Sequence, residues 1–108
     1  MKYIALLMLL SQLSYSYEMK ILNWYRLDRS NNMDMTAEVC FKLTPSPKNP
    51  IPVNITVDKN RKSEAYYMAW IGSKGSTCHV VSTQRGRVEV ETPKLKLKDS
   101  RDKFFSKN

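Results

Sequence analysis

The stretch GSKGSTCHVVSTQRGRVEVE, residues 72–91, alternates turn, strand, turn and strand, and it holds all three glycines of the chain. The loop GSKGS predicts a hairpin in which Gly72 and Gly75 adopt positive φ, and Gly86 has the same role in the following turn. The runs at 77–83 and 87–92 are rich in β-formers and alternate with period two. A phosphate-cradling loop leads into a helix, and no helical pattern follows these glycines. The stretch therefore predicts β-structure.

The same pattern recurs on both sides of this stretch. Strands are predicted at 19–27, 36–43, 53–57, 64–71 and 94–98, and the proline-rich TPSPKNPIP between the second and third predicts an extended connection. Seven short strands separated by turns predict an all-β fold, a small immunoglobulin-like β-sandwich; a small closed barrel is the alternative. We expect the core to be anchored by Trp24, Trp70 and Phe41.

The first 16 residues, MKYIALLMLLSQLSYS, resemble a signal peptide cleaved after Ser16. Their apolar run is shorter than the roughly 20 residues that span a bilayer; an uncleaved anchor or a buried first helix is the alternative. The predicted organisation is a signal peptide at 1–16 and one domain at 17–108 with a basic C-terminal tail. This predicts a periplasmic or secreted protein with no membrane span.

Cys40 and Cys78 are the only two cysteines, so only one intramolecular disulfide can form. Export would favour that bond, and a domain of this size gains from it. Alternation, however, puts Cys40 on the same face as Glu38 and Lys42, away from the apolar side of its strand. A half-exposed disulfide and a free thiol that seeks a partner both fit this pattern.

The chain is basic, and removal of Lys2 with the leader leaves 17 basic and 10 acidic residues, a net charge of +7. Such a charge favours acidic partners, although it also serves solubility. In PKLKLKDSRDKFFSKN, alternation predicts that Lys94, Lys96 and Lys98 project from one strand face. We expect these lysines, with Arg85 and Arg87, to bind the partner; lysines that guard an edge strand against unwanted pairing are the structural alternative.

Catalysis, metal binding and cofactors find little support in the sequence. His79 is the only histidine, and its neighbour Cys78 points to the opposite strand face, so the two cannot act on one substrate. The pair Met33 and Met35 is a weak Cu(I) pattern. We therefore expect no catalytic residue, no metal and no cofactor, and no specific nucleic-acid recognition. Asn54-Ile55-Thr56 matches the N-glycosylation acceptor pattern, which has meaning only in a eukaryotic source.

The order strand, GSKGST, strand, QRG, strand is similar to the middle of the small periplasmic curli-assembly proteins, which inhibit formation of the bacterial amyloid curli. The matching residues are Gly72, Ser73, Gly75, Ser76, Gln84 and Gly86. This resemblance implies an exported, non-enzymatic, protein-binding module of immunoglobulin-like fold whose partner is an amyloid-forming subunit. The chain departs from that family because it ends where a further strand should follow. The alternative function is a secreted basic domain that binds an anionic polymer or inhibits a secreted enzyme.

Overall fold

The computed structural model describes residues 17–28 and 34–105, and within them the chain forms seven strands and no helix. The predicted leader at 1–16, the methionine Met33 and the last three residues lie outside the described part. The strands are β1 (Glu18–Arg26), β2 (Met35–Thr44), β3 (Ile51–Val57), β4 (Ala65–Ile71), β5 (Ser76–Thr83), β6 (Val88–Thr92) and β7 (Leu97–Arg101).

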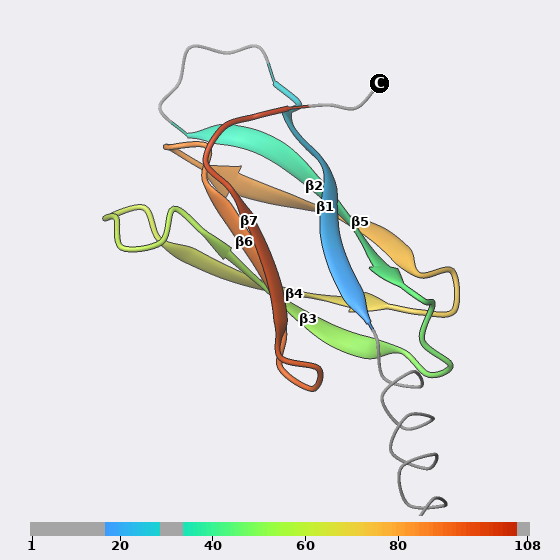
Figure 1. Cartoon of the computed structure of the whole chain (residues 1–108). Helices are drawn as coiled ribbons and strands as arrows, with labels where there is room; N and C mark the ends of the chain where they lie inside the picture. The colour runs from blue at the N-terminus through green and yellow to red at the C-terminus, as the bar shows by residue number, and fades with distance from the viewer. Residues whose placement is uncertain (1–16, 29–33, 106–108) are drawn as a thin grey trace, which may run out of the picture.

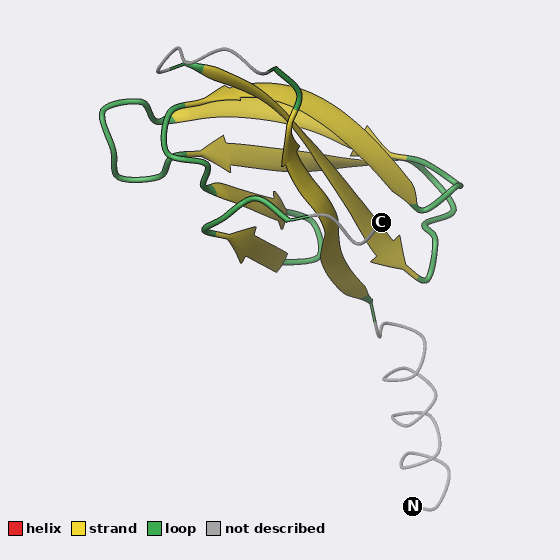
Figure 2. Cartoon of the chain, turned by 90° about the horizontal axis from the view of Figure 1, so that it is seen from above, coloured by secondary structure: helices red, strands yellow, loops and turns green. Residues whose placement is uncertain are grey.

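The strands form two antiparallel sheets, with the orders β1-β2-β5 and β4-β3-β6-β7. The sheets lie face to face as two layers; Figure 1 labels their strands, and Figure 2 shows the same fold after a quarter turn. The predicted all-β, seven-strand, sandwich-like architecture is thus confirmed at this level.

The core lies between the two sheets and comes mainly from strands that alternate strictly. In β2 every second side chain is buried, as in β3 and β6, because only one face of each strand turns toward the opposite sheet. The fully buried large side chains include Trp24, Phe41, Ile21, Leu43, Ile55 and Ile71. The predicted anchors Trp24 and Phe41 are confirmed.

Strand β1 does not alternate as predicted, because a bulge interrupts it. Ile21 lies opposite Phe41 and Asn23 lies opposite Cys40, so one extra residue stands between these pairs. A bulge of this kind shifts the following side chains to the other face. Ile21 and Trp24 are consequently both buried, whereas simple alternation predicts opposite faces for them.

The prediction that Trp70 of strand β4 anchors the core is wrong. Trp70 is 54% exposed, and it lies on the outer face of its sheet with Tyr66 and Met68. The smaller pair Ala69 and Ile71 points into the core instead. Side-chain size alone suggested the wrong face, because both faces of this edge strand are apolar.

The GSKGS loop is not a hairpin, which is a second correction. It joins β4 of one sheet to β5 of the other, so it turns a corner between the layers. Gly75 has a φ of 79° and Gly86 has a φ of 71°, as predicted, whereas Gly72 is not among the residues with positive φ. The backbone carbonyl of Gly75 accepts a hydrogen bond of 2.7 Å from the amide of Leu43, which holds the corner against the end of β2.

Two strand boundaries also differ from the prediction. Lys94 and Lys96 lie in the turn before β7, where Lys96 has a φ of 56° and donates a backbone hydrogen bond of 2.7 Å to Thr92. Alternation in KLKLK therefore does not mark a strand. Strand β3 starts at Ile51 and includes Pro52, which is tolerated because β6 pairs only with Asn54–Val57 and leaves the first part of β3 with a single neighbour.

Side chains and the C-terminal segment join the two sheets along their edges. On one side, Asp99 of β7 accepts a hydrogen bond of 2.8 Å from the amide of Ile21, next to the β1 bulge. Phe105 exchanges backbone hydrogen bonds of 2.6 and 3.0 Å with Trp24. On the other side, the hydroxyl of Tyr67 accepts a hydrogen bond of 3.0 Å from the amide of Ser82. Both lateral openings of the sandwich are thus crossed by specific contacts.

Candidate functional site

The most organised polar site centres on Asp58, which directly follows β3 and is completely buried. Its φ of 52° turns the chain sharply, so that the carboxylate faces the turn between β5 and β6. The five donors to this carboxylate are the hydroxyls of Ser63 and Thr83, at 2.7 and 2.8 Å, and the backbone amides of Gln84, Arg85 and Arg87, at 2.8, 3.2 and 3.3 Å. One carboxylate thereby satisfies most of the polar groups of a tight turn.

The electrostatics of Asp58 follow from these contacts. Burial alone raises the pKa of the carboxyl group, because the charged form loses its hydration. The hydrogen bonds from the amide of Gln84, the two hydroxyls and the amide of Arg85 stabilise the charged form and outweigh burial, so the pKa lies below its usual range. Asp58 is therefore a buried anion at neutral pH.

Asp58 also joins two turns that are distant in sequence. Its amide donates a hydrogen bond of 3.0 Å to the carbonyl of Arg87, and its carbonyl accepts one of 3.1 Å from the amide of Arg61. The turn at 58–64 and the turn at 84–87 are thus fixed against each other. We call this arrangement the Asp58 clamp.

The clamp groups three arginines around one residue. The backbone amides of Arg61, Arg85 and Arg87 all donate to Asp58, while their side chains are exposed. Within residues 17–28 and 34–105, none of these three guanidinium groups takes part in an ion pair or hydrogen bond. We call the three the arginine cluster. A planar guanidinium suits bidentate binding of carboxylate or phosphate groups.

The predicted binding residues do not form one stripe. Arg85 and Arg87 belong to the arginine cluster, but Lys94 and Lys96 occupy the turn beyond the other end of β6, about 16 Å away along a five-residue strand. Figure 1 shows the β5–β6 turn and the β6–β7 turn at opposite ends of these strands. Lys98 lies between them, with its Nζ 3.9 Å from Glu89. The structure brings two of the five predicted residues together and adds Arg61.

Sequence reasoning missed Asp58 and Arg61. Both lie in DKNRK, which has the composition of an ordinary polar turn. The donors to the Asp58 carboxylate reach as far as 29 residues along the chain. The only local signal was an aspartate directly after a strand, and that signal is common in turns.

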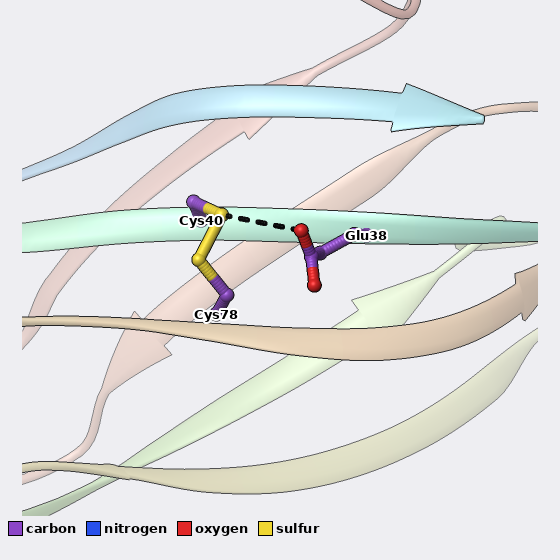
Figure 3. Close-up of side chains that lie close together, drawn as sticks. All are labelled: Glu38, Cys40 and Cys78. Atoms are coloured by element: carbon purple, nitrogen blue, oxygen red, sulfur yellow. Dashed lines mark hydrogen bonds between the residues drawn. A yellow bond between two sulfur atoms is a disulfide. The ribbon is translucent and has the colours of Figure 1, made fainter. Parts of the chain in front are cut away.

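The cysteines are joined in a disulfide, as one of the two predicted alternatives requires. Cys40 and Cys78 lie directly opposite each other on β2 and β5, on the outer face of their sheet. Figure 3 shows the bond with the carboxylate of Glu38 beside it, 3.8 Å from the Cys40 sulfur. The hydroxyl of Tyr25 donates to the same carboxylate, and this hydrogen bond raises the pKa of Tyr25.

The group formed by Glu38 and the disulfide is compact enough to hold a metal ion, but it lacks the free ligand atoms that a metal site needs. Ligand atoms of Glu38, Cys40 and Cys78 lie within 4.8 Å of one another. Both sulfurs are in the disulfide, so neither can act as a thiolate ligand. His79 is on the opposite face of β5, half-buried, with its ring 5.8 Å from that of Tyr67. The histidine and the sulfur atoms therefore do not combine into one site.

Comparison with known proteins gives no relative. No family model matches the chain, and neither the curated proteins nor the solved structures contain a match. In the part of the chain that the structure describes, no helix is long and apolar enough to cross a membrane.

Proposed function

We propose that this protein is an exported, non-enzymatic module of immunoglobulin-like fold that binds an acidic protein partner through its arginine cluster. The observation that carries the proposal is the convergence of Arg61, Arg85 and Arg87 on Asp58. Clusters of arginines are a recurrent means of recognising acidic or phosphorylated segments. Because Asp58 holds the backbone beneath them, little ordering of the chain is needed on binding.

The strand order supports the immunoglobulin-like part of the proposal. In the constant-type arrangement, the first, second, fifth and fourth strands form one sheet and the third, sixth and seventh form the other. The present chain differs by one change, because β4 pairs with β3 instead of lying beside β5. Tyr67 of β4 still contacts Ser82 of β5, so β4 is close to both sheets.

Export is supported by the disulfide and by the leader-like sequence at 1–16. Disulfides persist in secreted and periplasmic proteins and are rare in the cytosol. The non-enzymatic part is supported by the chemistry of the groups present. The two cysteines are bonded to each other, and His79 packs against Tyr67, not against a nucleophile.

A binding titration tests the role of the cluster. The probe is a fluorescent poly-glutamate peptide, and the variants are Arg61→Glu/Arg85→Glu/Arg87→Glu and the control Lys94→Glu/Lys96→Glu/Lys98→Glu, which changes the net charge equally. We expect binding by the native protein, loss in the arginine variant and retention in the lysine control. Equal loss of binding in the arginine variant and the lysine control would mean that only net charge matters, and would contradict the proposed site.

The narrower proposal concerns the identity of the partner. The resemblance of residues 72–86 to the curli-assembly proteins suggests an amyloid-forming subunit. Addition of the native protein at substoichiometric ratio should then delay fibril formation by a curli-type subunit, and the arginine variant should not. Absence of any delay at equimolar ratio would remove this partner and leave the broader proposal in place.

A further inference from the structure

The Asn54-Ile55-Thr56 triplet lies in β3 with both of its polar residues on the outer face. Asn54 is exposed and Thr56 is half-buried, while Ile55 between them is in the core. Neither polar side chain has a hydrogen-bond partner within the described residues. It is the only triplet in the chain that matches the N-glycosylation pattern. The amide and the hydroxyl that this modification needs are therefore both accessible.

An apolar surface lies beside this triplet on strand β4. Tyr66, Met68 and Trp70 are 72%, 57% and 54% exposed, and we call them the β4 stripe. The pairing register sets Asn54 directly opposite Met68. Side chains directly opposite each other are about 5 Å apart, and diagonal neighbours such as Tyr66 and Trp70 are about 7–8 Å away. Asn54 thus faces the middle of the stripe.

On its other side, Asn54 faces acidic residues of β6. Glu91 is its register partner there, and Glu89 is the next outward-facing residue. Asn54, Thr56, Tyr66, Glu89 and Glu91 line a shallow hollow in the outer face of the sheet. The hydroxyl of Tyr66 donates a hydrogen bond of 2.5 Å to Glu64, which fixes the ring at the edge of this hollow. The hollow has an apolar side and a side of hydrogen-bond acceptors.

We propose that Asn54 carries an N-linked oligosaccharide and that its first sugars cover the β4 stripe. The co-reactant is an oligosaccharide attached to a lipid diphosphate. The side-chain nitrogen of Asn54 forms a bond to the anomeric carbon and loses a proton. The bond between that carbon and the diphosphate oxygen breaks, and the lipid diphosphate leaves with the electron pair.

The chemistry of a sugar matches the surfaces on both sides of Asn54. The apolar C–H faces of pyranose rings pack on aromatic and thioether side chains such as those of the β4 stripe, of which Tyr66 also lines the hollow. The hydroxyl groups on the ring edge can donate to Glu89 and Glu91. An oligosaccharide attached at the centre would also remove the exposure of three large apolar side chains, which otherwise favours self-association of an exported domain.

This inference rests on the export part of the proposed function, and it is independent of the arginine cluster. Asn54 precedes Asp58 by four residues, about 13 Å along an extended strand, so the two sites use different residues. It conflicts with the curli-type partner, because this transfer belongs to the eukaryotic secretory pathway. Glycosylation of the chain in its natural source would therefore exclude a bacterial amyloid subunit and leave recognition of another acidic partner.

The first experiment is secretion of the full chain from cultured eukaryotic cells, with its own leader and, in parallel, with a standard leader before Tyr17. The secreted protein is analysed by gel electrophoresis before and after treatment with an N-glycan-releasing amidase. We expect a mobility shift that the amidase removes, that Asn54→Gln and Thr56→Ala abolish, and that Thr56→Ser retains. Secreted native protein without a shift would overturn the proposal, whereas failure of its own leader alone would contradict export instead.

The second experiment tests whether the sugar covers the stripe. The chain has two tryptophans, and Trp24 is fully buried, so acrylamide quenching of fluorescence reports on Trp70. The glycosylated protein is compared with the same sample after enzymatic release of the glycan. We expect quenching to rise on release, together with faster peroxide oxidation of Met68. Identical quenching and oxidation in the two samples would show that the sugar extends away from the stripe and would refute its covering role.

Discussion

Replacement of Asp58 by asparagine should be the most destabilising isosteric change in the turns of this protein. The substitution keeps the shape, removes the buried charge and puts an NH₂ group where one carboxylate oxygen accepts hydrogen bonds. The hydroxyls of Ser63 and Thr83 can rotate and accept from that group, but the backbone amides that point at either oxygen cannot. At least one partly buried amide therefore loses its acceptor in either orientation.

The magnitude follows from those contacts. An unsatisfied buried donor costs roughly 1–3 kcal/mol, and each hydrogen bond to a charged group that becomes neutral loses about 1 kcal/mol. The neutral side chain also avoids the desolvation cost of the buried charge, which offsets much of the weakening of the other bonds, so we expect Asp58→Asn to lower the free energy of unfolding by about 3 kcal/mol. For a domain of this size that corresponds to a fall in melting temperature of roughly 12–24 °C.

The assay is equilibrium unfolding in urea, followed by tryptophan fluorescence, at neutral and acidic pH. The control is Asp102→Asn, which makes the same change of charge at an exposed residue and should alter stability by less than about 0.5 kcal/mol. Because the pKa of Asp58 is lowered on folding from its ordinary value of 3.8, its stabilisation is present above that pH and is lost as pH falls through the folded pKa. The difference in the free energy of unfolding between the native protein and Asp58→Asn should therefore become smaller below pH 3.8. If Asp58→Asn were as stable as Asp102→Asn at neutral pH, the clamp would have no energetic role.

Three further outcomes are expected. Replacing both Cys40 and Cys78 by alanine should cost about 4 kcal/mol, because the bond closes a loop with a sequence separation of 38 residues; unchanged urea unfolding would contradict this. Trp24→Ala should cost about 3–5 kcal/mol and Trp70→Ala far less, since only the first is buried, and calorimetry that ranks them in the reverse order would refute the assigned faces. Gly86→Ala should destabilise by about 1 kcal/mol or more, because its φ is 71° and an added Cβ would lie 3.2 Å from the ring of Phe104; a melting temperature equal to the native value would argue against that conformation.

The sequence predicts the fold well wherever one strand face is clearly apolar and the other clearly polar. The alternation in β2, β3 and β6 gives the correct buried residues, because each of these strands has a single core-facing side. It fails at β1, where one extra residue reverses the facing of Trp24 and no local pattern marks the bulge. It fails again at β4, where both strand faces are apolar. The larger Trp70 suggested the core-facing side, but the smaller Ile71 is the buried residue.

The candidate site is less predictable than the fold, for a physical reason. Arg85 and Arg87 are visible as charges in a turn, and the disulfide is one of the two alternatives that the sequence leaves open for its two cysteines. The clamp depends on Asp58 meeting the amides of a turn more than 25 residues later, which no local pattern encodes. Likewise, Lys94, Lys96 and Lys98 alternate as in a strand, yet Lys94 and Lys96 lie in a turn that strand β6 separates from the arginines.

The position of the disulfide also determines how the protein would respond to force. A force applied to the two ends of the chain acts first on β1 at one end and on β6 and β7 at the other. The disulfide between Cys40 and Cys78 then carries the force between these two parts. The intervening segment, which contains β3 and β4, cannot lengthen while the bond is intact. The fully stretched chain should be shorter by roughly 130 Å than the reduced chain, given a separation of 38 residues. Under force, the segments before Cys40 and after Cys78 can extend, whereas the segment between them cannot. The maximum length of the unfolded chain therefore depends on whether its surroundings keep the disulfide oxidised.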